Sequence, residues 1–238
     1  MSIGKDFTEL QEKIGYTFFD VKLLETALTH SSYSNEQKSH GLNFSSNERL
    51  EFLGDAVLQM VISEHLFDIY KSQSEGSLTK MRQHIVCEKT LSKIAAEISL
   101  GDYIHLGRGE EATDCRSRPK VLADAIEALF GAVYIDCSYS SSTKYKDVII
   151  ALLSNEISRV SERQKGDYKT LLQQLVEKDG AATLEYVVIQ ESGPEHDKMF
   201  TVVAKVNNNI VGRGEAKSKK NAEMKAAKMA LTLFGVAI

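Results

Sequence analysis

The sequence predicts a protein of two domains, an all-α domain followed by a small α+β module with the order α-β-β-β-α. Up to about residue 157, apolar residues recur with the period of a helix and little alternates with the period of a strand. A short polar and charged segment then has the composition of a linker. After it, β-branched residues and alternating patterns lie between two helical patterns. We therefore expect domains at residues 1–160 and 167–236, joined by a linker at 161–166.

Helical patterns account for most of the first domain. Asp20 is a suitable N-cap for a helix that runs through Leu28. A polar stretch, residues 31–46, is rich in Ser, Asn and His and separates this helix from the next. The later helical patterns, separated by glycine-containing turns, cover residues 48–70, 77–86, 88–99, 118–135 and 145–160.

The second domain begins and ends with a helix. Residues 168–178 have a helical pattern, and residues 217–233 form a closing helix rich in Ala, Lys and Met. Between them, alternation and β-branched content predict three strands. Asn207-Asn208 is a good hairpin turn between the second and third of these strands. The predicted strands cover residues 184–190, 200–206 and 209–214.

Charge is distributed unevenly along the chain. The 238 residues have a net charge of -4. Residues 1–165 contain 19 Lys/Arg and 24 Asp/Glu, whereas residues 166–238 contain 10 and 9, so the acidic excess belongs to the first part. A nucleic-acid partner would therefore have to bind a local basic patch, because the overall charge does not attract it.

Cysteine content and hydropathy indicate the compartment. The three cysteines are an odd number without a C-x-x-C pair, which argues against a disulfide framework and against a zinc site. The polar N-terminus lacks the apolar run of a signal peptide. No stretch approaches the roughly 20 apolar residues of a membrane span. We therefore expect a cytoplasmic protein with no membrane partner.

One predicted helix has a carboxylate face and an apolar face. At 100° per residue, Glu48, Glu51 and Asp55 fall within about 60° of one another. Leu50 and Val57 fall near the opposite side. Such a pattern is also typical of an ordinary solvated acidic face. Like charges at this spacing repel one another, and a hard divalent cation, which prefers oxygen ligands, would offset the repulsion.

A second carboxylate pair lies in the otherwise apolar stretch 121–131. Asp124 and Glu127 are three residues apart and share a helix face. Carboxylates in so apolar a helix are rarely buried without a partner, which is either Lys or Arg or a metal ion. If the two helices align, Glu51 and Asp55 complete a cluster of four carboxylates suited to magnesium. Such a site can activate water and stabilise charge on a phosphodiester.

The remaining motifs carry less information. Glu75, before Gly76, is either a further outer carboxylate or an ordinary loop charge. The six histidines form no H-x-H or H-x-x-x-H pair and are interpreted as structural or solvated. Both Gly-Arg-Gly segments, residues 107–109 and 212–214, lack the rest of a nucleotide-binding pattern, so they are interpreted as turns. No nucleotide cofactor is expected.

These residues together resemble a known family, bacterial ribonuclease III. The segments of the first domain that carry the resemblance are NERLEFLGDAVL at Asn47–Leu58, Ala27–Ser32, Glu75–Arg82 and Ala123–Asp136. The tail resembles a double-stranded RNA-binding domain at Asp167–Gln173, Gly193–His196 and Gly212–Ala227. The resemblance covers nearly the whole chain in the expected order.

The resemblance implies a homodimeric endoribonuclease that cuts double-stranded RNA. It implies hydrolysis with magnesium, for which manganese can substitute, leaving 5′-phosphate and 3′-hydroxyl ends. The implied substrates are precursors of ribosomal RNA, structured messenger RNA and transfer RNA. The resemblance also implies that each subunit contributes one carboxylate cluster to a shared valley and makes one of two cuts in the duplex.

The resemblance also assigns roles to individual residues. The metal ligands are expected to be Glu51, Asp55, Asp124 and Glu127, of which Asp55 and Glu127 are most closely tied to the chemistry. Glu48 and Glu75 match supporting acidic positions. Phe52 matches an aromatic residue that inserts into the partner subunit, although an ordinary core position remains an alternative.

In the RNA-binding domain the resemblance assigns contacts to Thr170, Gln173, His196, Lys217, Lys219 and Lys220. The lysines cluster at the start of the last helix, where free backbone amides also attract phosphate. Thr170 and Gln173 would meet ribose hydroxyls in the shallow groove. Such modules recognise the shape of the duplex more than its sequence. A lysine-rich helix end is also typical of a surface that serves only solubility.

Two other functions remain open from the sequence. A double-stranded RNA-binding protein that does not cleave would be favoured by loss of a carboxylate, and all four are present. A metal-dependent hydrolase of small phosphate esters is disfavoured by the RNA-binding tail. Duplex RNA and a chromogenic phosphate ester, tested side by side, separate these functions.

Overall fold

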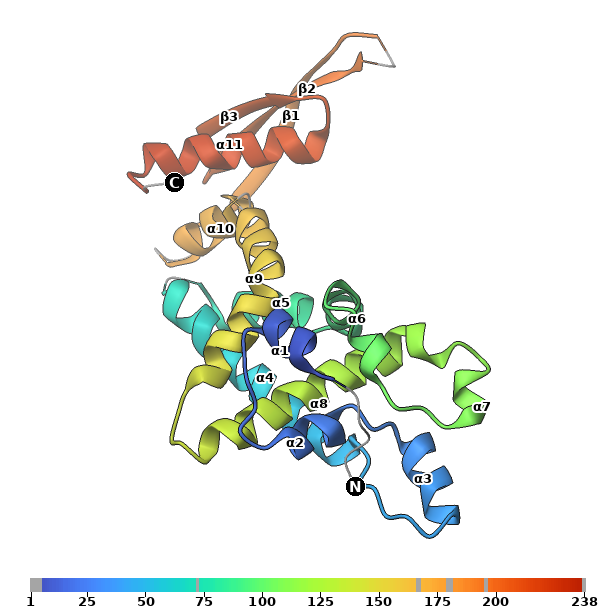
Figure 1. Ribbon diagram of the computed structural model, residues 1–238. Coiled ribbons are helices and arrows are strands. Elements are labelled where there is room, and N and C mark those ends of the chain that lie inside the picture. The colour runs from blue at the N-terminus through green and yellow to red at the C-terminus, as the bar shows by residue number, and fades with distance from the viewer. Residues whose placement is uncertain (1–5, 72, 166–167, 179–181, 195–196, 237–238) are drawn as a thin grey trace. The chain divides into compact units, whose positions relative to one another are not determined.

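The structure, a computed structural model, describes residues 6–71, 73–165, 168–178, 182–194 and 197–236. Tertiary contacts divide the chain into two compact units, Met1–Val160 and Ser161–Ile238. The first unit is helical and the second contains a three-stranded sheet with helices (Figure 1), so the predicted fold class is confirmed. Among the described residues, no helix combines the length and the apolar character needed to cross a membrane.

The first unit consists of α-helices and two short 3-10 helices. In chain order these are α1 (Thr8–Ile14), α2 (Val21–Ala27), α3 (Ser31–Ser39), α4 (Glu48–Ile69), α5 (Glu75–Ile85), α6 (Glu88–Glu97), η1 (Leu100–Tyr103), α7 (Arg108–Glu111), η2 (Cys115–Ser117), α8 (Pro119–Ser138) and α9 (Lys144–Lys165). Helix α9 continues through residues 161–165, where the sequence suggested a linker.

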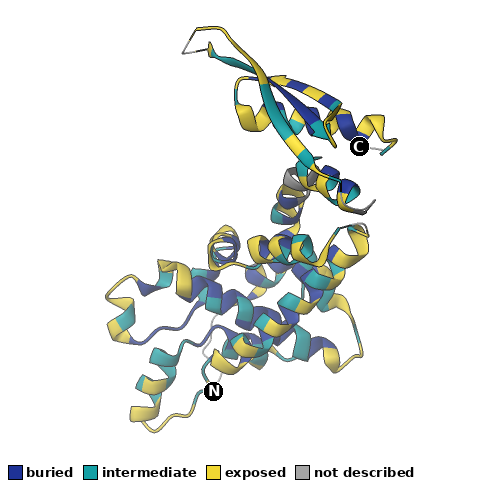
Figure 2. Cartoon of the chain, turned by 180° about the vertical axis from the view of Figure 1, so that it is seen from behind, coloured by how far each residue is buried: buried dark blue, intermediate teal, exposed yellow. Residues whose placement is uncertain are grey.

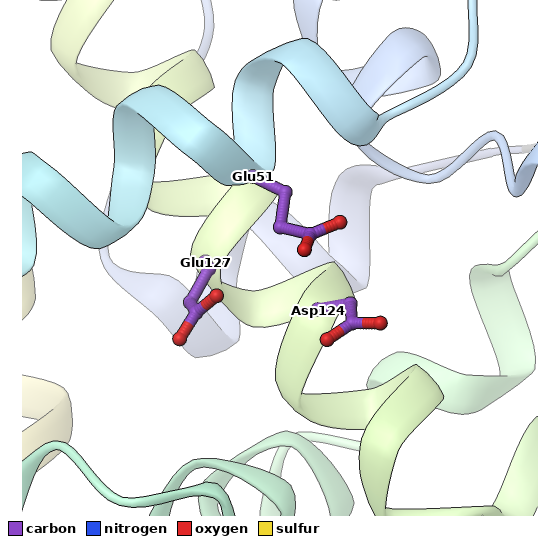
Figure 3. Close-up of side chains that lie close together, drawn as sticks. All are labelled: Glu51, Asp124 and Glu127. Carbon is purple, nitrogen blue, oxygen red and sulfur yellow. The ribbon is translucent and has the colours of Figure 1, made fainter.

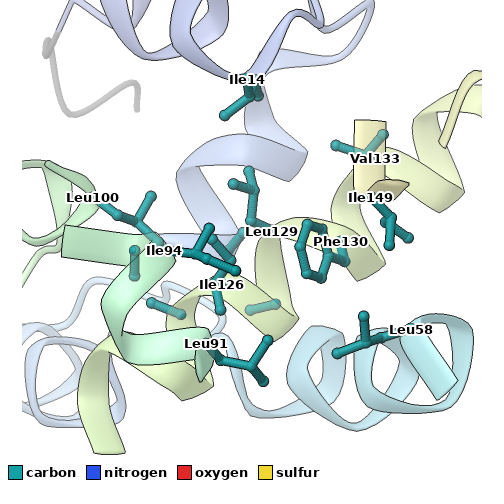
Figure 4. Packing of buried hydrophobic residues seen from close by; sticks show 14 of the residues in the cluster. Ile14, Leu58, Leu91, Ile94, Leu100, Ile126, Leu129, Phe130, Val133 and Ile149 are labelled. Atoms are coloured by element: carbon teal, nitrogen blue, oxygen red, sulfur yellow. The ribbon is translucent and has the colours of Figure 1, made fainter. Parts of the chain in front are cut away.

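Helix α8 is the centre of the first unit. It packs against α4, α6 and α2, and most of its residues are buried. Figure 4 shows Ile126, Leu129 and Phe130 of α8 among apolar side chains from several helices. Small residues between these large ones allow the neighbouring helices to approach α8 closely. Burial of so much apolar surface is the main force that stabilises this unit.

Asp136, near the end of α8, is a buried carboxylate with a structural role. It is only 2% exposed. Its oxygens accept hydrogen bonds from the Tyr16 hydroxyl and from the backbone N–H groups of Phe19 and Asp20, each at 2.8 Å. Three donors compensate for the cost of burying the charge. Asp136 thereby fixes the chain just before α2, where Asp20 is the predicted N-cap and accepts from the backbone N–H of Lys22.

Three segments of the first unit differ from the sequence prediction. The polar stretch 31–46 contains α3, which has no buried residue and therefore no apolar periodicity to reveal it. His30 caps this helix, because its Nδ1 accepts from the backbone N–H of Ser32. Residues 107–109 are the start of α7 and not merely a turn. Helix α1 was not assigned from the sequence.

The second unit has the predicted element order. It comprises α10 (Tyr168–Lys178), β1 (Leu184–Ser192), β2 (Met199–Val206), β3 (Asn209–Ala216) and α11 (Lys219–Leu233). The strands form one antiparallel sheet in the order β1-β2-β3. Asn207 and Asn208, both with positive φ, form the predicted hairpin turn. Figure 2 shows the buried residues of this unit on the sheet, on α10 and on α11.

Residues 212–214 lie within β3, so the predicted strand at 209–214 is confirmed and their separate interpretation as a turn was wrong. Both glycines lie against α11. A Cβ atom on Gly212 would collide with the carbonyl oxygen of Ala226, and one on Gly214 with that of Ala222. The Gly-Arg-Gly pattern therefore reflects close packing of a helix on a strand, which requires the absence of a side chain.

Candidate active site

Two glycines bring the carboxylate helices together. Helices α4 and α8 cross at Gly54 and Gly131. A Cβ atom on Gly54 would collide with the carbonyl oxygen of Glu127 and lie 2.9 Å from the backbone nitrogen of Gly131. A Cβ atom on Gly131 would likewise collide with the carbonyl oxygen of Leu50. Glycine in a helix interior costs about 1 kcal/mol relative to alanine. The cost is accepted at both positions because only glycine lets the backbones of the two helices come into contact.

The crossing places acidic residues of the two helices beside one another. Glu51 lies one turn before Gly54, and Glu127 lies one turn before Gly131, so both carboxylates flank the contact. Figure 3 shows Glu51 of α4 together with Asp124 and Glu127 of α8. One ligand atom from each of these three half-buried residues lies within 4.8 Å of the others. Residues more than 70 positions apart thus form one carboxylate cluster.

The environment opposes ionisation of this cluster. Burial, followed by the charges of Asp55, Asp124 and Glu51, raises the pKa of Glu127 to about 7. Burial and the charge of Asp124 also raise the pKa of Glu51. Desolvation and like charges both disfavour the carboxylate form. A cation among these residues would relieve both effects, and this is the electrostatic setting of many functional sites.

The other predicted acidic residues take different positions. Asp55 is not in the group of three, although its charge raises the pKa of Glu127. Its Oδ1 accepts from the Gln59 amide at 3.2 Å. Glu48 is exposed and accepts from the hydroxyl of Ser46 at 2.8 Å. Glu75, the first residue of α5, is exposed and accepts from the hydroxyl of Thr79.

Lys120 is a charged neighbour of the cluster that sequence reasoning missed. Its Nζ lies 3.4 Å from Oδ1 and 3.3 Å from Oδ2 of Asp124. Lys120 and Asp124 are four residues apart in the predicted helix at 118–135, and this spacing could have revealed the ion pair. The two crossing glycines were also missed, although a glycine inside a strongly helical pattern indicates a packing constraint.

The raised pKa of Glu127 predicts how stability depends on pH when no divalent cation is present. Its ordinary value of 4.5 applies to the unfolded chain, so the folded state binds the proton more tightly. This contribution to stability is fully present below about pH 4.5 and is lost as the pH rises to about 7. We expect Glu127→Gln to gain stability relative to the wild type over this range. Urea unfolding in EDTA at about pH 5 and pH 8 measures the difference in free energy of unfolding between the variant and the wild type. The same difference at both pH values would contradict the prediction.

The predicted RNA-binding residues lie on two helices of the second unit. Thr170 and Gln173 are exposed on α10. Lys217 precedes α11 and pairs with Asp197 at 2.7 Å. Lys219 and Lys220, both exposed, begin α11, whose N-cap is Ser218. His196 lies outside the described residues. The three lysines thus gather at one helix N-terminus, where phosphate is favoured.

Phe52, predicted to contact a partner subunit, is 81% exposed. It lies on α4, one residue after Glu51, and projects away from the core. The alternative of an ordinary core residue is therefore wrong for the first unit by itself. Exposure of a large aromatic side chain is costly in water unless another surface covers it.

Comparison with known proteins agrees with this architecture. A family model described as Ribonuclease-III-like matches residues 20–157, and a model described as double-stranded RNA binding motif matches residues 168–233. The nuclease domain of ribonuclease III from Campylobacter jejuni has a similar structure, with a TM-score of 0.57 and 35% identity, over 64% of this chain and 99% of that one. The fold and these matches define a ribonuclease with a double-stranded RNA-binding domain.

Full-length relatives identify the family. The chain is 46% identical over 226 residues to Ribonuclease 3 of Natranaerobius thermophilus, covering 95% of both proteins. It is 48% identical over 223 residues to Ribonuclease 3 of Borreliella burgdorferi, covering 92% of this chain and 88% of that protein. The chain belongs to the ribonuclease III family.

Proposed function

We propose that this ribonuclease hydrolyses phosphodiester bonds within double-stranded RNA at the carboxylate cluster of α4 and α8, with magnesium as the metal ion and manganese as a substitute. The products would have 5′-phosphate and 3′-hydroxyl ends. The observation that carries the proposal is the convergence of Glu51, Asp124 and Glu127 within 4.8 Å in a protein with a double-stranded RNA-binding domain.

The residues present fit a hard divalent cation. All three donors are carboxylates, the oxygen ligands that magnesium and manganese prefer. Their mutual repulsion, which raises the pKa of Glu127 and of Glu51, would be offset by a cation. We assign these three residues as ligands together with Asp55, whose charge acts on Glu127, and we place Asp55 and Glu127 closest to the chemistry. When bound, the ion lowers the pKa of water and offsets charge that develops on the phosphodiester.

The chain itself provides positioning. Glu127 and Glu51 come from rigid helices held in contact at Gly54 and Gly131, so their carboxylates are preorganised. Gln59 donates to Asp55 and restrains its orientation. Glu48 and Glu75 are exposed, and we assign them supporting roles. No histidine lies in the group of three carboxylates, so acid–base catalysis by an imidazole is not part of the proposal.

We propose that the second unit holds the RNA through Thr170, Gln173, His196 and the lysines at the start of α11. Lys219 pairs with Glu191 at 3.1 Å and also lies over the ring of Phe200, 5.3 Å from its centroid. This cation–π contact keeps the ammonium group near the helix N-terminus. Backbone amides and ammonium groups would then bind phosphate together.

Replacement of Lys217, Lys219 and Lys220 by alanine should weaken duplex binding for all sequences alike. Each phosphate contact that is lost reduces the slope of log K against log salt by about 1. Gel shifts in calcium at several salt concentrations measure this slope. Lys205→Ala, on strand β2, is the control. An unchanged slope in the triple variant would contradict the proposed surface.

We propose that the protein acts as a homodimer through one face of α4. Phe52, Met60 and Phe67 fall within about 80° of one another around the helix axis, and they are 81%, 48% and 64% exposed. A groove of about 690 Å³ lies beside this face and is lined by apolar residues that include Leu66 and Leu78 together with polar and charged residues. A second copy would cover this apolar surface. The Campylobacter jejuni nuclease domain also has a region involved in dimer formation.

Phe52→Ala should weaken this dimer by about 30-fold or more, because truncation of a large aromatic anchor at an interface costs about 2 kcal/mol or more. Sedimentation velocity over a range of concentrations measures the dissociation constant. Phe19→Ala is the matched control, since Phe19 is 88% exposed on a different part of the unit. If both substitutions weaken the dimer equally, or if neither changes its dissociation constant, the assignment of Phe52 is wrong.

The two domains are assigned to separate tasks, cleavage and RNA binding. We propose residues 1–160 as the endonuclease domain, residues 161–166 as a linker whose first five residues continue helix α9, and residues 167–236 as the RNA-binding domain. We further propose a cytoplasmic enzyme that processes precursors of ribosomal RNA, structured messenger RNA and transfer RNA, without a nucleotide cofactor.

The substrate class is tested by three substrates offered in magnesium: a long duplex RNA, a single-stranded RNA of the same sequence, and a chromogenic phosphate ester. We expect the duplex alone to be cut. RNA ligase should join the fragments without prior treatment of their ends, because joining requires a 5′-phosphate and a 3′-hydroxyl. Hydrolysis of the ester at a comparable rate would favour a small-molecule hydrolase. Binding of duplex RNA without any cutting would contradict the proposed activity.

A further inference from the structure

Lys120 supplies a positive charge to the carboxylate cluster from within the chain. Its ammonium nitrogen is nearly equidistant from the two Asp124 oxygens, at 3.4 and 3.3 Å. The charge also acts on Glu51 and Glu127, since Lys120 opposes the rise in the pKa of both. In turn, the charge of Asp124 raises the pKa of Lys120. Lys120 is thus coupled to all three residues of the cluster.

The energetics of helix α8 alone do not favour a lysine at this position. Lys120 lies in the first turn of α8, directly after Pro119 at the helix start. A positive charge there opposes the helix dipole. The pair with Asp124 also has the weaker orientation, since the acidic residue follows the basic one at i,i+4. The negative charge of the cluster therefore explains the position of Lys120 better than helix stability does.

The ion pair of Lys120 is accessible and weak enough to be replaced. The Lys120 side chain is 76% exposed, whereas that of Asp124 is 26% exposed. The ammonium group can therefore move into solvent without any change in the backbone. Exposed ion pairs contribute little to stability. A divalent cation that binds Asp124 would use the same carboxylate oxygens that now contact Lys120.

We propose that Lys120 is a tethered counter-ion of the cluster that competes with the divalent cation for Asp124 and so raises the cation concentration at which the site fills. This inference rests on the proposed role of the cluster as a metal site. In the cation-free enzyme, the ammonium group of Lys120 compensates part of the negative charge of the three converging carboxylates.

The test is the cation affinity of the RNA-free, full-length protein. Calcium and magnesium are titrated separately by isothermal calorimetry into the wild type, Lys120→Gln and Lys120→Arg. We expect Lys120→Gln to bind both cations about three- to fivefold more tightly, the range that loss of an exposed ion pair allows. Lys120→Arg keeps the charge and should stay within about twofold of the wild type.

Lys93→Gln is the matched control, because Lys93 also makes exposed ion pairs, with Glu97 at 3.5 Å and Glu156 at 2.8 Å. It should not change the cation affinity. An unchanged or weaker affinity in Lys120→Gln would overturn the competition. If Asp124→Asn binds the cations as tightly as the wild type does, the proposed metal site itself is wrong, and the role of Lys120 is overturned with it.

Discussion

Replacement of Glu127 by glutamine is expected to lower kcat for cleavage of duplex RNA by about 10²- to 10³-fold, the loss typical when one electrostatic group of a preorganised site is removed. Glutamine has nearly the same shape but lacks the charge that the cation requires. Glu127 is also the residue on which burial and three neighbouring carboxylates converge. Its replacement therefore removes a ligand and not a packing contact.

The stability of Glu127→Gln separates this cause from misfolding. Because the charge of Glu127 is unfavourable in the cation-free protein, the variant should be at least as stable as the wild type at about pH 8 in EDTA. Loss of activity together with retained stability is then the expected combination. Asp68→Asn is the control, since Asp68 is an exposed carboxylate near the other end of the same helix and has no assigned role in the site. Single-turnover cleavage rates that fall equally in both variants would contradict the assignment of Glu127.

The second large effect is expected from Gly54→Ala. The added methyl group would collide with the backbone carbonyl of Glu127, which is not the end of a flexible side chain, so α4 and α8 have to separate. We expect the free energy of unfolding to fall by about 3 kcal/mol, at the upper end of overpacking costs. Cleavage should also be lost, because catalysis is sensitive to displacements of about 1 Å.

Gly76→Ala is the matched control for this prediction. Gly76 lies in helix α5, and a Cβ atom there has no neighbour within 4 Å. Alanine should therefore leave stability unchanged or raise it by up to about 1 kcal/mol. Denaturant unfolding compares the two variants. If Gly54→Ala is as stable and as active as Gly76→Ala, the helix crossing does not position the site as described.

Much of the fold could be predicted because its main elements bury apolar faces with a regular period. Helices α4 and α8 and the three strands are of this kind. Helix α3 was missed because none of its residues is buried. Residues 212–214 were misinterpreted because glycine is common in turns, whereas here it allows α11 to approach β3. Such long-range contacts leave no local pattern in the sequence.

The candidate site was predicted in part for the same reasons. Helical spacing places Glu51 and Asp55 on one face of α4, and Asp124 and Glu127 on one face of α8. Their convergence could only be assumed, because it depends on where the two helices cross. The crossing places Glu51 with Asp124 and Glu127, while Asp55 lies outside that group of three. The contact of Lys120 with Asp124 depends on side-chain conformation, which the sequence does not determine.

The most direct test of the central claim is to locate the metal ion. Crystals of the full-length protein soaked in manganese, measured at the manganese absorption edge, would show the ion by anomalous scattering. The carboxylate cluster predicts a peak at about 2 Å from oxygens of Glu51, Asp124 and Glu127, and no such peak in Glu127→Gln at the same concentration. A peak elsewhere in the first unit, or none at a manganese concentration that supports cleavage of duplex RNA, would show that the active site has been misplaced.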